Sequence, residues 1–163
     1  MANFSLVAPL KTVYITEGWG HPRARGLHAG IDLRAPVGTP VFAMASGVVV
    51  YAGPYSDTTG LSVELLHDGG QMATRYLHHS KLAVKTGQMV KAGDLLGYTG
   101  FATSPHLHAD VWIVPTAWGE YVQKFGQPVG TGGNKTFAGR AMMKVPVEPL
   151  IPGASYQDDV KVM

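Results

Sequence analysis

Four residues in two short segments have the types and spacing of a metal site: His28 with Asp32, and His106 with His108. The segments lie far apart in a chain of 163 residues that contains no cysteine. Imidazole nitrogens and carboxylate oxygens are ligands that zinc accepts. Three such ligands leave a coordination position open, which indicates a hydrolytic site, whereas a fourth protein ligand would indicate a structural one.

His106 and His108 are expected on a β-strand. The sequence after Pro105, HLHADVWIV, is rich in β-branched and aromatic residues, and these favour strands. Residues two apart point away from each other on a helix. On a strand they share a face, with backbones about 6.6 Å apart. One histidine can then bind a metal while the other reaches the water on it.

His28 and Asp32 have a spacing that is common in helices, but Pro36 follows too closely for a helix to continue. In a straight strand the two residues would lie about 13 Å apart, too far to share one ion. Gly30 between them permits a bend, because glycine adopts backbone angles that other residues avoid. The sequence therefore predicts a kinked entry into a strand.

Three segments, in this order, resemble the lysostaphin/LytM-like zinc metalloendopeptidases, which cut peptides in bacterial peptidoglycan. The segments are HAGIDLRAPVGTPVFAMASGVVVYAG, TRYLHHSKLAVKTGQMVKAGDLLGYTG and SPHLHADVW. The similarity extends from about Ile15 to Val111, with a weaker similarity at Glu148 and Pro149. An HxH pair alone would be weak evidence, whereas three ordered segments are strong evidence.

The resemblance implies that His28, Asp32 and His108 bind one Zn²⁺ ion and that His78 and His106 are catalytic. Zinc acidifies a bound water and polarises the scissile carbonyl. We assign His106 as the base and His78 as the group that stabilises the oxyanion, although the sequence does not separate these roles.

The family usually follows its HxH with an aromatic residue and Glu, where this chain has Ala109 and Asp110. This departure leaves the ligand set intact. It leaves open which contact orients the ligand here in place of the contact made by the family's longer Glu side chain.

The other histidines are expected to lie outside the site. His79 should point to the opposite face of a strand from His78, in a structural or solvated position. His67 begins a turn-like sequence with two glycines and is expected at a solvated hairpin tip. His21 lies in a polar segment and should be exposed.

The chain is expected to be mainly β, because its 21 glycines and 11 prolines favour turns and short strands. The predicted fold is an antiparallel sheet with the metal site on it and a groove walled by loops, as in the lysostaphin-like peptidases. Predicted strands cover residues 40–52, 61–66, 71–77, 91–97 and 106–114.

We expect one domain over residues 1–163, with a core at about 15–114 and a long loop and C-terminal extension at 115–163. Loops 54–60 and 115–140 are candidate groove walls, and Trp118–Phe125 within the second could form one or two helical turns. That second loop is either a substrate wall or a packed cover. The tail beyond Pro152 is expected to be loosely ordered.

The net charge of +2 is too small to indicate a nucleic-acid partner. The longest apolar stretch, residues 41–53, is interrupted and too short to span a bilayer, and no signal-peptide pattern is visible. The expected partner is bacterial peptidoglycan, reached outside the cell, in the periplasm or by phage delivery, as a bacteriophage lysin or virion-associated hydrolase. The alternative is a catalytically inactive relative that acts as a cell-wall-binding or regulatory module. The bond that is cut and the oligomeric state are not predicted.

Overall fold

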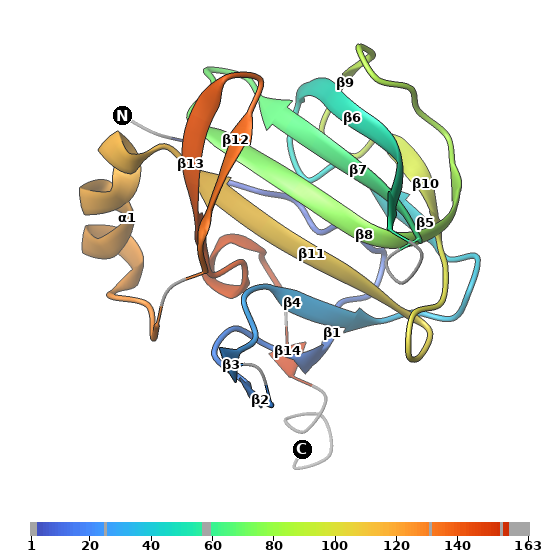
Figure 1. Cartoon of the computed structure of the whole chain (residues 1–163), viewed down its shortest axis with the longest axis horizontal. Coiled ribbons are helices and arrows are strands. Elements are labelled where there is room, and N and C mark those ends of the chain that lie inside the picture. Colours follow the sequence, from blue (N-terminus) through green and yellow to red (C-terminus); the bar gives the residue numbers. More distant parts are fainter. Residues whose placement is uncertain (1–2, 25, 57–59, 131, 154, 157–163) are drawn as a thin grey trace.

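A twelve-stranded sheet forms most of the chain in the computed structural model, which describes residues 3–24, 26–56, 60–130, 132–153 and 155–156 (Figure 1). Its main path runs in the order β14-β1-β4-β11-β8-β7-β6-β9, while β10 pairs with β5 and β8, and β13 pairs with β11 and β12. The strands are β1 (Tyr14–Glu17), β2 (Pro22–Arg23), β3 (Gly26–Leu27), β4 (Ile31–Arg34), β5 (Pro40–Phe42), β6 (Gly47–Ser56), β7 (Gly60–His67), β8 (Met72–Leu82), β9 (Met89–Val90), β10 (Leu95–Thr99), β11 (His106–Ile113), β12 (Asn134–Phe137), β13 (Arg140–Val145) and β14 (Ser155–Tyr156).

The prediction of a mainly β, antiparallel fold is confirmed. Among the described pairs, only β1 and β14 run parallel, and β2 and β3 form a separate two-stranded ribbon. The helical elements are η1 (Pro115–Ala117), α1 (Trp118–Phe125) and η2 (Glu148–Leu150). None of the helices in the described part of the chain has the length and apolarity needed to cross a bilayer.

Three predicted strands differ from the observed ones, and the one predicted at 71–77 continues to Leu82 as β8. Residues 40–52 are divided into β5 and β6, because the backbone N–H of Met44 donates to the Tyr76 hydroxyl (2.9 Å) instead of continuing a ladder. The predicted strand 91–97 begins only at Leu95. The Asp94 carboxylate accepts a hydrogen bond from the Lys91 N–H (2.8 Å) and closes a turn over the preceding residues.

The predicted loop 115–140 contains helix α1, as expected, and also strand β12, which the sequence analysis missed. β12 and β13 form a hairpin in which Phe137 pairs with Arg140. Both connecting residues, Ala138 and Gly139, have positive φ (48° and 81°), as the tight hairpin turn requires. Alanine is an unusual residue at the first of these positions, so the turn gives no clear sequence signal.

Strand β11 separates the main core from the opposite face of the sheet. Four alternate apolar side chains enter the core: Leu107, Ala109, Val111 and Ile113. The side chains between them, those of His106, His108, Asp110 and Trp112, occupy the other face, because successive residues of a strand alternate. One strand thus supplies both packing and polar groups.

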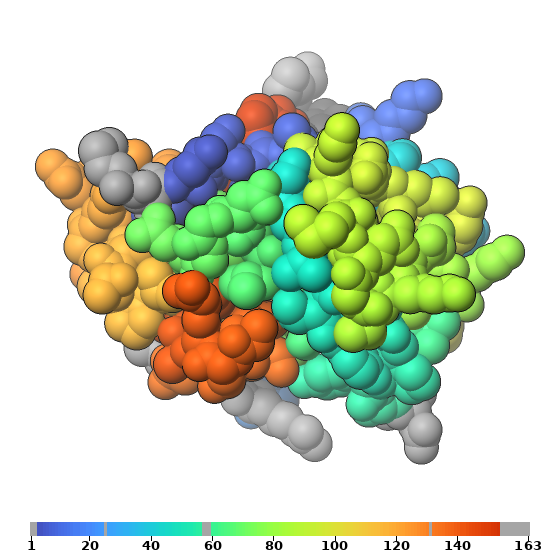
Figure 2. All heavy atoms as spheres, turned by 90° about the horizontal axis from the view of Figure 1, so that it is seen from above, coloured from blue at the N-terminus to red at the C-terminus, as the bar shows by residue number. Residues whose placement is uncertain are grey.

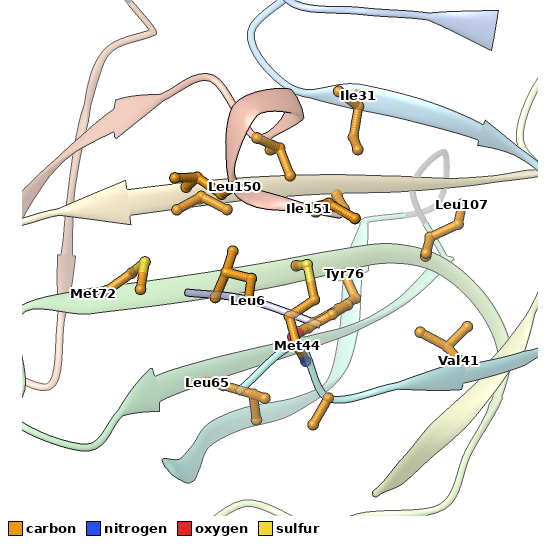
Figure 3. Packing of buried hydrophobic residues seen from close by; sticks show 14 of the residues in the cluster. Leu6, Ile31, Val41, Met44, Leu65, Met72, Tyr76, Leu107, Leu150 and Ile151 are labelled. Atoms are coloured by element: carbon orange, nitrogen blue, oxygen red, sulfur yellow. The ribbon is translucent and has the colours of Figure 1, made fainter. Parts of the chain in front are cut away.

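Both ends of the described chain cover this core. Leu6 from the N-terminal segment and Leu150 and Ile151 from the C-terminal part pack among residues of β4, β8 and β11 (Figure 3). In Figure 2 the N-terminal segment (dark blue) lies on the surface between α1 (orange) and the green strand region. Tyr121 of α1 is buried and meets the Phe4 ring edge-on at 5.7 Å. Helix α1 therefore packs on the core, as the packed-cover alternative predicts.

The β12–β13 hairpin makes a second, smaller cluster on the opposite face of the sheet. Phe137 and Met142 of the hairpin pack with Ala73 and Trp112. The hairpin thereby covers part of the face that carries His106 and His108.

The prediction that His67 is a solvated hairpin tip was wrong. Its side chain is buried, with Nδ1 3.1 Å from the Ser46 carbonyl oxygen and Nε2 2.8 Å from the Thr74 hydroxyl. The Thr74 hydroxyl lies 2.7 Å from that of Tyr76. The turn starts one residue later than expected, so His67 still belongs to β7 and points inward.

Of the tail beyond Pro152, Ser155–Tyr156 pairs with β1, whereas residues 157–163 lie outside the described part.

His79 is also buried, on β8. Its Nδ1 lies 3.3 Å from the Leu61 carbonyl oxygen. Burial lowers the pKa of His79 from 6.5 to about 4, because the charged imidazolium loses its hydration.

We expect His79 to make the folding stability of the metal-free protein depend on pH. The unfolded chain takes up this proton near pH 6.5, whereas the folded chain resists until about pH 4. The free energy of unfolding should therefore fall as the pH drops through this window, by roughly 3 kcal/mol from this residue. Urea unfolding at pH 7, 5.5 and 4 measures it. The His79→Gln variant should show a shallower slope, and equal slopes in both proteins would contradict the assignment.

Candidate metal centre

The side chains of His28, Asp32 and His108 converge at one end of β11, where β4 lies beside β11 (Figure 1). β4 and β11 are paired with His108 opposite Asp32, and His28 lies just before β4. Asp32 Oδ1 is 2.9 Å from His108 Nδ1 and 3.5 Å from His28 Nε2. The two imidazole nitrogens are 3.4 Å apart. The structure thus brings together the three residues that the sequence singled out as ligands.

The spacing of these atoms suits one small cation. A tetrahedral ion with bonds of about 2.0–2.2 Å holds its ligand atoms about 3.3–3.6 Å apart. Two of the three observed separations fall in this range, and the third is a direct His108–Asp32 hydrogen bond. Two nitrogens and one carboxylate oxygen are a donor set typical of catalytic zinc sites.

Gly30 provides the bend between His28 and β4. Its φ is 156°, and a Cβ built there would lie 2.8 Å from the His108 ring and 2.9 Å from the Ala109 carbonyl oxygen. Glycine therefore allows both the turn of the backbone and the close approach of His108.

Each candidate ligand is also held from its outer side. His28 Nδ1 lies 3.1 Å from the Gly18 carbonyl oxygen, and His108 Nε2 lies 3.0 Å from Asp110 Oδ2. These acceptors hold a proton on each outer nitrogen. The inner nitrogen of His108, which now donates to Asp32, becomes available to a metal when it loses its proton. Arg23 donates to Asp32 Oδ2 at 3.1 Å.

Gly18 and Arg23 were not predicted as supporting residues, because neither belongs to a recognisable motif. Asp110 was noted only as a departure from the family pattern. The structure answers the question that this departure raised: the shorter carboxylate contacts His108 directly.

The Asp32 carboxylate and the His108 imidazolium stabilise each other's charged forms. Burial alone would raise the pKa of the Asp32 carboxyl, but hydrogen bonds from His108 and His28 outweigh burial and hold the pKa well below its usual range. Burial alone would lower the pKa of His108, but Asp110 and Asp32 outweigh it and raise the pKa. A cation bound to His108 Nδ1 would replace the proton that this nitrogen now shares with Asp32.

His106 lies beside the three candidate ligands. Its Nε2 is 3.8 Å from Asp32 Oδ1, and its Nδ1 is 2.9 Å from the Ser104 carbonyl oxygen. That carbonyl accepts the Nδ1 proton and leaves Nε2 as a proton acceptor directed at the candidate metal position.

His78 lies next to His106, with ring centroids 4.8 Å apart, and 6.2 Å from the His108 ring. The pairing of β7 and β8 shifts register here, between Leu61 and Val63, and His78 has a φ of 71°. Strained backbone in a residue other than glycine is found most often at functional sites. His21, in contrast, is exposed, as predicted. The arrangement combines three side chains that could hold a cation with two adjacent imidazoles that can move a proton or donate a hydrogen bond.

Residues 26–123 match peptidase family M23. Lysostaphin of Staphylococcus simulans is 42% identical over 86 residues, which are 51% of this chain and 17% of that protein. The peptidoglycan DD-endopeptidase ShyA of Vibrio cholerae is 42% identical over 95 residues, 53% of this chain and 20% of that protein. The shared segment is therefore at most a fifth of these two relatives.

Solved structures show the same arrangement of strands. The catalytic domain of lysostaphin from Staphylococcus simulans superposes with a TM-score of 0.58 at 36% identity, over 62% of this chain and 80% of that domain. A zinc-containing peptidase from Vibrio cholerae gives 0.56 at 32% identity, over 64% of this chain and 35% of that one. The predicted resemblance and fold are thus confirmed.

Proposed function

Because the chain belongs to peptidase family M23, we propose that it is a zinc-dependent endopeptidase that hydrolyses peptide bonds in bacterial peptidoglycan, in stem peptides or cross-bridges. The observation that carries this proposal is the convergence of His28, Asp32 and His108 on one point that His106 Nε2 also faces. An inactive wall-binding relative would have no use for a complete ligand set with an adjacent base.

His28, Asp32 and His108 would hold a single zinc ion through Nε2, one carboxylate oxygen and Nδ1. Zinc bound there would supply Lewis acidity that polarises the scissile carbonyl and acidifies water. The donor set supports zinc, as does the similarity to the zinc-containing peptidase of Vibrio cholerae.

His106 is the proposed general base. Its Nδ1 proton is held by the Ser104 carbonyl oxygen, so Nε2 can accept a proton from the attacking water and later deliver it to the leaving amine. His78, beside His106, is proposed to donate a hydrogen bond to the oxyanion that develops on the substrate.

The proposed partner is the peptide part of the bacterial wall, since ShyA is a peptidoglycan DD-endopeptidase and lysostaphin is an antimicrobial peptidase. The proposed place of action is outside the cytoplasmic membrane. We further propose a bacteriophage lysin or virion-associated wall hydrolase as the setting, and a single catalytic domain as the working unit.

The test is digestion of purified cell walls with and without metal. We expect new amino termini to appear, to disappear after treatment with 1,10-phenanthroline, and to return when zinc is added. Asp32→Asn should remove this activity, whereas Asp68→Asn, in an exposed turn, should retain it. Walls with glycine cross-bridges and walls with direct cross-links, compared by sequencing the new termini, identify the bond. Hydrolysis that persists in the chelator would exclude the zinc mechanism.

A further inference from the structure

Asp110 is a fully buried carboxylate that lies directly behind His108. Besides His108, it accepts hydrogen bonds from Arg75 on β8 (2.9 Å from Nη2) and from the Trp112 indole (2.5 Å). The ammonium of Lys144 on β13 lies 3.5 Å from it. Burial alone would raise the pKa of Asp110, but His108, Arg75 and Lys144 hold it well below its usual range.

Three of these donors meet at one atom. His108 Nε2, Arg75 Nη2 and Lys144 Nζ lie 3.0, 2.9 and 3.5 Å from Asp110 Oδ2. A single carboxylate thus contacts two cationic side chains and the outer nitrogen of a candidate ligand. The positive charge of Lys144 weakens the negative potential that Asp110 exerts on the His108 imidazole.

Lys144 comes from outside the segment that matches the family, residues 26–123. The β12–β13 hairpin brings it to Asp110, and its ammonium lies 4.8 Å from the centre of the Trp112 ring. Its side chain is only 10% exposed, so water screens its charge little. The position of Lys144 is therefore a property of this chain rather than of the shared segment.

We propose that Asp110 is a positioning residue for His108, and that Lys144 weakens zinc binding by competing for the same carboxylate oxygen. The proposal rests on the proposed zinc site. A carboxylate that accepts the outer N–H of a histidine fixes its ring and raises its basicity as a ligand. A cation on that carboxylate reduces both effects, and its own charge opposes a dication nearby.

The experiment measures zinc affinity of the purified protein by competition with a chromophoric chelator, without substrate. Asp110→Asn should bind zinc about 10- to 100-fold more weakly. Lys144→Met should bind zinc about three- to tenfold more tightly. The matched control is Lys135→Met, since Lys135 lies on the same hairpin but pairs with Glu64 at 3.5 Å. It should stay within twofold of the wild type.

A double variant separates the two ways in which Lys144 can act. If Lys144 acts through Asp110, Lys144→Met should gain little in the Asp110→Asn background. An equal gain in both backgrounds would overturn the route through Asp110. The double variant also removes one charge of each sign, which protects its folding if Asp110→Asn alone leaves the cations uncompensated.

Cobalt(II) substitution gives a second readout that activity does not provide. The visible ligand-field bands should change in Asp110→Asn and stay unchanged in Lys135→Met. If Asp110→Asn and Lys144→Met both show the same zinc affinity and cobalt spectrum as the wild type, the inference is overturned, even if the walls are digested. Failure of wall digestion, with the affinity shifts as expected, would count against the proposed function alone.

Discussion

Replacing His106 with alanine should lower the rate of wall-peptide hydrolysis by about 100- to 10,000-fold and leave zinc bound. His106 Nε2 lies 3.8 Å from Asp32 Oδ1, and the Ser104 carbonyl oxygen lies 2.9 Å from the other ring nitrogen, Nδ1. Alanine removes the proton acceptor without removing any of the three candidate ligands. The measurements are the release of amino termini from purified walls and the zinc content after dialysis.

His21→Ala is the matched control, because His21 is exposed and lies outside the site. It should retain wild-type hydrolysis. Wild-type hydrolysis by His106→Ala would refute the assignment, and loss of zinc would make His106 a fourth ligand. His78→Ala should also retain zinc and lose most activity, since the oxyanion would lose a donor.

Replacing Gly30 with alanine should weaken zinc binding at least about 100-fold. The added methyl group would lie 2.8 Å from the His108 ring and 2.9 Å from the Ala109 carbonyl oxygen. Since the backbone of β11 cannot give way without breaking its pairing with β4, the His108 ring or the His28 segment must move. Either movement separates the ligand atoms.

Gly38→Ala separates this collision from backbone strain. Gly38 also has a positive φ (88°), but a Cβ there meets no atom within 4 Å. It should lose about 1–2 kcal/mol of stability from the unfavourable φ and keep its zinc affinity. Equal zinc affinities for both variants would show that the contact with His108 has no role. Competition with a chelator, together with thermal unfolding, gives both quantities.

The sequence predicted the local geometry of the site because that geometry depends on short-range rules. Residues two apart share the face of a strand, so His106 and His108 had to lie together once β11 was recognised. Gly30 was expected to bend the chain, and its φ of 156° agrees. The convergence of His28 and Asp32 with His108 came from the family resemblance, since no local rule pairs β4 with β11.

What the sequence did not predict depends on contacts between distant segments. Asp110 alone gave no sign that Arg75 and Lys144 would meet on it, because strand pairing decides that encounter. His67 was expected in water because its neighbours are turn residues. The turn begins one residue later than expected, so His67 is the last residue of β7. It shares the buried face of that strand with Val63 and Leu65.

The packing at both ends of the chain has a consequence for protein engineering. The main core includes Leu6 before the family segment and Leu150 and Ile151 after it. A fragment trimmed to residues 26–123 would expose this apolar surface and lose the hairpin that brings Lys144 to Asp110. Fusions of this chain to other proteins should therefore place their junctions outside residues 3–156, which also keeps the pairing of β14 with β1.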